Sequence, residues 1–299
     1  MNTESTSRGS NTVIATTITT PKKVVIQGYA GAFHQIAAEL YFKDQAIDIV
    51  PANSFDELVA LAERPERADT ALMAIENSVA GSLMYNYDLL RQSKLKIVGE
   101  IYLRIKQNLM TLPGVRLEDL QEVHSHYMAI AQCRDFFRAY PHIKLIETAD
   151  TALSAKDIRD NNWQQVGAIA STLAAELYDL EIIGSSIETN KQNYTRFWVL
   201  ARENESLDSS KVEKVSICFA TDHEVGSLYR VLSVLSAYGI NLTSIQSTPI
   251  IGKPWEYRIF VDFITDGKVS LKQAIDGIRP LTYDLEVMGM YGLGEQYEY

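Results

Sequence analysis

The sequence predicts an α/β protein in two parts, and three observations support that prediction. From residue 23 to residue 202, short apolar runs typical of buried strands alternate with helical segments. This order favours a mainly parallel sheet with helices on both faces. Residues 203–212 are polar, charged and free of periodicity, which indicates a linker. Residues 213–291 then repeat strands and helices in the order βαββαβ, which predicts a separate, smaller unit.

The elements of the first part follow from apolar runs and from helical spacing. The expected strands cover residues 24–26, 47–50, 71–75, 96–98, 122–124 and 166–170. One helix is expected to end near Phe42. Apolar residues at helical spacing indicate helices from Phe55 to Ala62 and from Ile130 to Phe137, and a further helix is expected from Ala174 to Leu180. A further helix is expected directly after residues 148–151.

The second part has the pattern of a ferredoxin-like unit. Its expected strands cover residues 215–219, 240–247, 257–263 and 285–287. Leu228, Val231, Leu232 and Leu235 form the apolar stripe of one helix, and Leu271, Ile275 and Ile278 mark the other. Gly239 suits the position that follows a helix end.

Composition narrows the class of protein. The chain has 299 residues, 46% of them hydrophobic, with a formal net charge of -10 and a pI near 5.1, which argues against a general binder of nucleic acid or of anionic membranes. The two cysteines, Cys133 and Cys218, form no CxxC, and the five histidines form no metal-binding set. We therefore expect no metal and a cytoplasmic protein. Residues 1–22 are expected to be a disordered leader, without an apolar run long enough for a membrane span.

Polar residues gather where the expected strands end, which is where open α/β sheets bind ligands. Gly31 lies in the turn after the first strand, and Glu76, Asn77 and Ser78 follow the third. Ser125 with Gln132, two helical turns apart, and Ser171 extend the pattern to two further strand ends. Each feature taken alone also fits a helix cap or a tight turn. Their convergence predicts a crevice rich in neutral hydrogen-bond donors.

Residues 193–197, Asn-Tyr-Thr-Arg-Phe, join a polar loop to a strongly apolar segment. Thr195 offers a hydroxyl, Arg196 a planar fork of donors suited to a carboxylate, and Phe197 a ring. The junction suits a site for a small organic acid, although an ordinary strand start with one solvated arginine has the same sequence. The chain contains no G-x-S-x-G, P-loop or G-x-G-x-x-G motif. Acyl transfer, phosphoryl transfer and dinucleotide redox chemistry are therefore disfavoured.

These segments together resemble the prephenate dehydratase family. Residues 193–197 resemble its TRF motif, 28–33 its glycine motif, and 75–78 its ENS segment. Residues 125–133 are similar to its SH…QC segment and 168–171 to its alanine-rich strand end, so the resemblance covers residues 23–202. It implies a two-lobed catalytic domain of the type II periplasmic-binding-protein kind. His34, Ala74 and Tyr127 depart from residues common at these positions of the family.

The C-terminal unit resembles an ACT domain, a regulatory module that binds amino acids. Residues 225–228 stand where the family has its GAL motif and residues 245–249 where it has ESRP. Gln246 and Thr248 replace the Glu and Arg of ESRP, which puts the strength of regulation in question. The resemblance implies an effector site formed by Gly226, Ser227, Leu228, Gln246 and Ser247. A purely dimerising module is the alternative. Residues 292–299 are expected to be a C-terminal tail.

The two resemblances imply an activity and its residues. Prephenate loses carbon dioxide and water to give phenylpyruvate, without metal or organic cofactor, under control by phenylalanine in a homodimer or a dimer of dimers. Thr195 is the expected donor to the leaving hydroxyl, and Arg196 either clamps a substrate carboxylate or braces the sheet. The other expected substrate-binding residues are Asn77, Ser78, Ser125, Gln132, Ser171, Glu76, Gly31 and Phe197.

Two other functions fit parts of the same pattern. An arogenate dehydratase, acting on the amino-acid analogue of prephenate, shares the same motifs. A non-catalytic amino-acid sensor is the alternative from a different class of protein, and the intact residues 195–197 argue against it.

Overall fold

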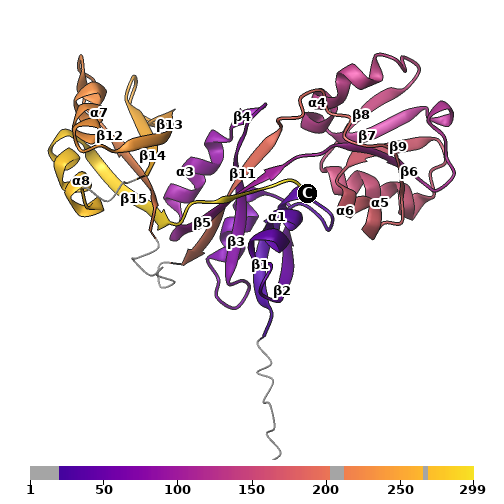
Figure 1. Ribbon diagram of the computed structural model, residues 1–299, viewed down its shortest axis with the longest axis horizontal. Coiled ribbons are helices and arrows are strands. Elements are labelled where there is room, and N and C mark those ends of the chain that lie inside the picture. The colour runs from indigo at the N-terminus through magenta and orange to yellow at the C-terminus, as the bar shows by residue number, and fades with distance from the viewer. Residues whose placement is uncertain (1–19, 203–211, 265–268) are drawn as a thin grey trace, which may run out of the picture.

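A computed structural model describes residues 20–202, 212–264 and 269–299, which form two lobes and a C-terminal unit (Figure 1). Most of the predicted leader and nearly all of the predicted linker lie outside the described residues. The C-terminal unit and the second lobe lie on opposite sides of the first lobe (Figure 1). The two-lobed architecture with a C-terminal βαββαβ unit is confirmed.

The first lobe is built on a mixed sheet in the order β5-β11-β3-β1-β2. Its strands are β1 (Lys22–Gln27), β2 (Ile47–Ala52), β3 (Thr70–Asn77), β4 (Gly81–Ser82), β5 (Leu95–Arg104) and β11 (Tyr194–Arg202), and its helices are α1 (Phe33–Tyr41), α2 (Phe55–Ala62) and α3 (Met84–Gln92). β1 runs parallel to β2 and β3, whereas β11 is antiparallel to both β3 and β5. The sheet is mixed because β5 leads the chain out to the second lobe and β11 brings it back.

The second lobe has a five-stranded sheet in the order β10-β6-β9-β7-β8, with β7 parallel to β8 and β9. Its strands are β6 (Asn108–Thr111), β7 (Glu122–His126), β8 (Lys144–Thr148), β9 (Val166–Ala170) and β10 (Glu181–Gly184), and its helices are α4 (Tyr127–Phe137), α5 (Thr151–Asn161) and α6 (Thr172–Leu177), with a 3-10 turn at Leu117–Asp119. Its core combines small residues such as Ala152, Ala155 and Ala168 with larger apolar side chains such as Ile130 and Phe137.

Two segments connect the lobes, residues 105–107 and residues 185–193, and they are tied to each other. The Ile105 N–H donates to the Asn193 carbonyl at 2.7 Å. The Gln107 N–H donates to the carboxylate of Glu188 at 2.9 Å, and that side chain is fully buried. The crossing is therefore a paired, hydrogen-bonded junction.

The C-terminal unit has the predicted βαββαβ order. It consists of β12 (Lys214–Ala220), α7 (Ser227–Ala237), β13 (Asn241–Pro249), β14 (Tyr257–Ile264), α8 (Leu271–Ile278), a 3-10 turn at Arg279–Leu281, and β15 (Tyr283–Tyr291). Its antiparallel strands lie in the order β13-β14-β12-β15. Ser270 begins α8 with a capping box, in which Ser270 accepts from Gln273 N–H and the Gln273 side chain accepts from Ser270 N–H.

The C-terminal unit is fixed to the first lobe through a shared sheet and a shared core. Gly289 of β15 pairs with Ile97 of β5, and a Cβ at this glycine would lie only 2.3 Å from the Ile97 carbonyl oxygen. Aromatic side chains from both units, including Trp198 and Phe260, pack into one hydrophobic cluster. The segment expected to be a tail contains a further strand, β16 (Glu295–Tyr297), which pairs in parallel with β5.

Candidate active site

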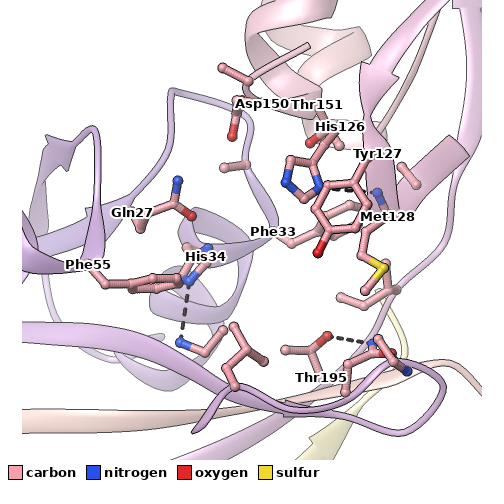
Figure 2. Close-up of a pocket in the computed structure, with 18 of the residues that line it drawn as sticks. Gln27, Phe33, His34, Phe55, His126, Tyr127, Met128, Asp150, Thr151 and Thr195 are labelled. Carbon is pink, nitrogen blue, oxygen red and sulfur yellow. Dashed lines mark hydrogen bonds between the residues drawn. The ribbon is translucent and has the colours of Figure 1, made fainter. Parts of the chain in front are cut away.

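A cavity of about 570 Å³ lies between the two lobes and is lined by residues of both (Figure 2). Residues from β1, α1, α2, β3 and β11 form its first-lobe wall, and residues from α4 and α5 form its second-lobe wall. Of the predicted site residues, the cavity brings together Thr195, Asn77, Gln132 and Phe197. The volume suits a small organic molecule.

Four helices, α1, α2, α4 and α5, begin at the wall of this cavity. The side chains of Ser54, His126 and Asp150 cap three of them, whereas α1 starts at Ala32 without a side-chain cap. Helix beginnings present N–H groups and a partial positive charge, which favour anions. No lysine or arginine is among the described residues that line the cavity. Backbone N–H groups are therefore its main source of positive potential.

Thr195 belongs to a chain of neutral amides at the base of the cavity. The Asn77 Nδ2 donates to Thr195 Oγ1 at 3.0 Å and to Asn193 Oδ1 at 2.7 Å. The Asn193 Nδ2 in turn donates to Gln132 Oε1 at 3.0 Å, which links the first lobe to α4. Because Thr195 Oγ1 accepts from Asn77, its own proton is left to donate into the cavity. Gln107 lines the same region, and its Oε1 is buried without a partner among the described residues.

His34 and Phe197 form an apolar part of the first-lobe wall. Their rings meet edge to face with centroids 4.9 Å apart, and the Ala74 N–H donates to His34 Nε2 at 3.4 Å. Burial lowers the pKa of His34 from 6.5 to about 3, so the ring is neutral near pH 7. It therefore serves as a hydrogen-bond acceptor and a packing surface.

His126 and Asp150 lie on the opposite wall, across from Gln27 and His34 (Figure 2). The His126 Nδ1 accepts from the Met128 N–H at 3.4 Å, and burial lowers the pKa of this histidine despite the nearby Asp150. The Asp150 Oδ1 accepts from the Leu153 N–H at 2.9 Å. Burial raises the pKa of Asp150 even though it caps a helix.

Arg196 does not line the cavity, because neighbouring side chains of a strand point to opposite faces. Its guanidinium lies in a buried ion cluster with Glu100 and Asp262, at Nε–Oε2 2.7 Å and Nη1–Oδ2 2.6 Å, and it donates to the Tyr291 hydroxyl at 3.2 Å. Lys214 completes the cluster on Glu100 at 2.9 Å. Burial opposes the charge, yet Asp262 and Glu100 hold the pKa of Arg196 well above its usual value. The geometry places Arg196 as a brace between the first lobe and the C-terminal unit.

Four other predicted site residues make contacts outside the cavity lining. Ser125 belongs to β7 and not to α4, so it does not share a helical face with Gln132, and its hydroxyl donates to the Ile169 carbonyl at 2.6 Å. The exposed Ser78 donates to the Gln192 carbonyl at 2.8 Å. Ser171 caps α6 and donates to the Gly31 carbonyl at 2.6 Å. Glu76 pairs in register with Arg196 and shares its face of the sheet.

The glycine turn after β1 brings the two lobes into close contact. Gly31 has a φ of 88°, and a Cβ there would lie 2.8 Å from Ala174 of the second lobe. A Cβ on Gly28 would lie 2.8 Å from the Asp150 carboxylate. The Tyr178 hydroxyl adds a bond of 2.8 Å to the carbonyl of Ala30. Glycine is needed here because the second lobe leaves no space for a side chain.

Several residues of the cavity were not predicted as site residues. They include Gln27, Asn53, Asp56, Tyr85, Gln107, His126, Met128 and Asp150. Ser54 and Asp150 carry a recognisable signal, because each precedes a helix as a cap. His126 lies in the segment that resembles SH…QC. The remaining residues have no sequence signal, because only the meeting of two lobes turns their positions into a site.

A second hollow, of about 300 Å³, lies on the C-terminal unit and contains part of the predicted effector set. Ser227, Leu228 and Ser247 line it together with Trp255, whereas Gln246 does not. Gly226 begins α7 with a φ of 79° and open space around its Cα. The Ser227 hydroxyl donates to backbone carbonyls of its own loop. Thr248, at the Arg position of ESRP, donates instead to Asp88 of α3 at 3.3 Å.

The fold and the cavity define a two-lobed α/β protein with a cavity between its lobes that suits a small organic molecule. Comparison of the sequence with family models matches residues 24–205 to prephenate dehydratase and residues 215–273 to the ACT domain. The chain belongs to the prephenate dehydratase family and carries an ACT domain. It is 35% identical over 281 residues to arogenate dehydratase/prephenate dehydratase 2, chloroplastic, of Arabidopsis thaliana, covering 90% of this chain and 72% of that protein.

Solved structures share this fold. The prephenate dehydratase of Arthrobacter aurescens, in complex with L-Phe, is 25% identical with a TM-score of 0.79, covering 90% of this chain and 89% of that chain. GqqA, described as a novel type of quorum quenching acylase, is 28% identical with a TM-score of 0.82, covering 91% of this chain and 98% of that chain. No helix in the described part of the chain is long and apolar enough to cross a membrane.

Proposed function

We propose that the interlobe cavity converts prephenate to phenylpyruvate in phenylalanine biosynthesis. The bond between a ring carbon and its carboxylate breaks, and its electron pair enters the ring. The C–O bond at the opposite ring carbon then breaks, and the departing hydroxide takes a proton to become water. Formation of the aromatic ring drives the reaction. The protein's task is to orient two carboxylates and to stabilise the departing oxygen.

Thr195 is the proposed donor to that oxygen, and its bond from Asn77 is the observation that carries the proposal. The Asn77 amide donates to Thr195 Oγ1 at 3.0 Å, which leaves the Thr195 proton available to donate to the substrate. A threonine hydroxyl is a poor acid, so its contribution comes from placement while charge develops on the oxygen. Gln132 is the proposed amide contact of the substrate, Asn77 acts through its bond to Thr195, and Phe197 is the wall beside the substrate ring.

The substrate carboxylates are proposed to bind at the helix beginnings. The uncapped start of α1 at Ala32 lies on the first-lobe wall of the cavity, and the start of α4 at His126 lies on the second-lobe wall. N–H groups at two helix starts on opposite lobes suit two carboxylates on one rigid ring. This arrangement explains how a cavity with no lysine or arginine among its described lining residues takes an anion.

Phenylalanine is the proposed effector, bound between the ACT domains of a homodimer. The Arthrobacter aurescens relative is a complex with L-Phe. The hollow beside Leu228 supports the proposal, as do the exposed apolar side chains of Val225 and Ile251, 99% and 98% accessible, and of Tyr229 and Trp255. Large apolar side chains at such exposure favour a partner surface. Isothermal titration with phenylalanine gives binding heat if this holds, and no heat with unchanged turnover leaves a dimerisation module only.

The domain boundaries follow the same proposal. Residues 23–202 form the catalytic domain and residues 213–291 the regulatory domain, joined by residues 203–212. We infer a cytoplasmic enzyme, which is consistent with two buried free cysteines, Cys133 and Cys218.

A turnover assay tests the function directly. The purified full chain is incubated with prephenate, and phenylpyruvate is measured with and without phenylalanine. Formation of phenylpyruvate that phenylalanine inhibits is expected. Absence of phenylpyruvate from a folded, monodisperse sample would contradict the proposed reaction.

A further inference from the structure

Gln107 is a buried amide at the crossing between the lobes, and it lines the interlobe cavity. Its backbone is held on both sides, because its N–H donates to Glu188 at 2.9 Å and its carbonyl accepts from the Ile187 N–H at 2.7 Å. The residue is only 4% exposed. Its Nε2 donates to Gln132 Oε1 at 3.3 Å, whereas its Oε1 is buried without a partner among the described residues. A buried acceptor without a donor is costly, and a ligand held in the cavity can supply the missing donor.

The neighbouring amides decide which atom of Gln107 is left unpaired. The chain of amides starts at Asn77, whose Oδ1 accepts from the backbone N–H groups of residues 79–80 at 3.0 and 2.8 Å. A backbone N–H only donates, so the Asn77 Nδ2 must be the atom that donates to Asn193 Oδ1. The Asn193 Nδ2 then donates to Gln132 Oε1. Gln107 therefore meets this oxygen with its own Nε2, and its Oε1 is left free.

The unpaired atom of Gln107 is thus an acceptor, and its identity is fixed by two backbone N–H groups through three side-chain amides. Prephenate carries a single hydrogen-bond donor near pH 7. Its two carboxylates are ionised and only accept, its keto oxygen has no hydrogen, and its ring hydroxyl alone can donate. The unpaired acceptor in the wall therefore matches the one donor of the ligand.

We propose that Gln107 is a specificity-determining residue, whose Oε1 accepts a hydrogen bond from the ring hydroxyl of prephenate. The inference rests on the proposed dehydratase function and adds a second contact to the leaving oxygen. That oxygen keeps its own hydrogen, which Gln107 holds, while Thr195 donates to one of its lone pairs. A ring acid without this hydroxyl leaves the buried oxygen of Gln107 unpaired, so the cavity favours the hydroxylated ring over the aromatic product.

Gln107→Met tests this contact, because it keeps the length of the side chain and removes the amide oxygen. Two quantities are measured on the full chain: kcat/KM for prephenate, and the inhibition constant of phenylpyruvate, whose ring carries no hydroxyl. We expect kcat/KM to fall about 5- to 100-fold, the range for a hydrogen bond whose partner is left unpaired. We expect phenylpyruvate to bind as tightly as in wild type or up to about tenfold more tightly, because it no longer buries an unpaired oxygen. Circular dichroism and thermal melting confirm that the variant is folded.

Gln27→Met is the matched control, since it makes the same substitution elsewhere in the cavity lining (Figure 2). Gln27 is half-buried, so water reaches its amide. The two measured quantities are therefore not expected to move in opposite directions in this variant. Gln107→Leu, which also lacks the amide oxygen, repeats the test should Gln107→Met fail to fold.

The outcomes separate a substrate contact from a packing role. Parallel losses of prephenate turnover and of phenylpyruvate affinity in a folded Gln107 variant would mean that the amide only supports the wall, and would overturn the inference. An unchanged kcat/KM, or the same opposite shift in Gln27→Met, overturns it as well. In each of these cases, turnover of prephenate by the wild type leaves the proposed function standing. No turnover by the wild type overturns the proposed function and the inference together.

Discussion

The two faces of β11 have very different chemical surroundings. Thr195 and Phe197 point to the interlobe cavity, among neutral amides and aromatic rings. Arg196 and Trp198 point the other way, toward the ACT domain, where the guanidinium meets the carboxylates of Glu100 and Asp262. Consecutive residues of the strand therefore face two different environments. One is a cavity that no described lysine or arginine lines, and the other is a buried ion cluster.

This difference teaches that one short motif serves two purposes. The side chain that carries the proposed chemistry and the side chain that binds the ACT domain are neighbours on one rigid backbone. A change in the ACT domain that moves Asp262 therefore acts on Thr195 through a single peptide unit. The predictions below separate these two purposes, because changes on one face alter turnover and changes on the other alter stability and regulation.

The largest expected effect is on turnover and comes from the cavity face. Thr195→Ala removes the proposed donor, and kcat for prephenate is expected to fall about 10²- to 10⁴-fold. Thr195→Ser keeps a hydroxyl and is expected to retain most of the activity. Steady-state kinetics measure both. Near-normal turnover by a folded Thr195→Ala variant would remove this residue from the mechanism.

The next effect is on stability and comes from the opposite face. Arg196→Met leaves the buried carboxylates of Glu100 and Asp262 without their partner, which is expected to lower the free energy of unfolding by about 3–5 kcal/mol. Arg196→Lys keeps the charge and is expected to cost less. Urea denaturation followed by circular dichroism measures both. Equal unfolding midpoints for Arg196→Met and wild type would contradict the brace.

A smaller effect is expected on regulation. Asp262→Asn keeps the shape of the side chain but removes the charge that the ACT domain presents to Arg196. We expect phenylalanine to inhibit this variant several-fold more weakly, while kcat without phenylalanine stays within about twofold of wild type. Dose–response curves of phenylpyruvate formation measure the change. An unaltered curve would place the communication between the domains elsewhere.

At neutral pH the smallest effect comes from His34 at the cavity wall, because its contribution to stability changes only below about pH 6.5. The pKa of His34 is about 3 in the folded chain and near 6.5 when unfolded, so the unfolded chain binds more protons between these values. The free energy of unfolding contributed by His34 therefore falls as pH drops from 6.5 toward 3, by at most ~1.4 kcal/mol per pH unit. His34→Ser removes this contribution. Urea midpoints across that pH range are expected to vary less in the variant, and identical slopes would contradict the burial of a neutral ring.

The alternating pattern of apolar runs was sufficient to predict the order of most strands and helices. It was insufficient for α3, whose sequence mixes polar and apolar residues, and for the short strands β4, β6, β8, β10 and β16, none of them longer than five residues. The predicted mainly parallel sheet became mixed because β11 returns antiparallel between β3 and β5. Periodicity gives each element but not its direction relative to distant neighbours.

The candidate site shows the same limit. Thr195, Asn77 and Gln132 were predicted from strand ends, and the structure brings all three into one amide chain. The two roles left open for Arg196 differ only in which face of β11 is turned to the cavity, and that depends on the partner strands. From the sequence, Asp150 could be recognised only as a helix cap. Its desolvation arises from the approach of the first lobe at Gly28, which the sequence pattern does not reveal.

The return of β16 to the edge of β5 has a consequence for the ACT domain as a module. The chain leaves the first lobe after Arg202, builds the regulatory unit, and then adds a strand to the lobe it left. Excising the unit at its sequence boundary would uncover an edge of β5, and an uncovered edge strand is a template for aggregation. A transplanted regulatory unit would in turn need an acceptor edge in its new host. The two domains are separable in sequence but interleaved as folded objects.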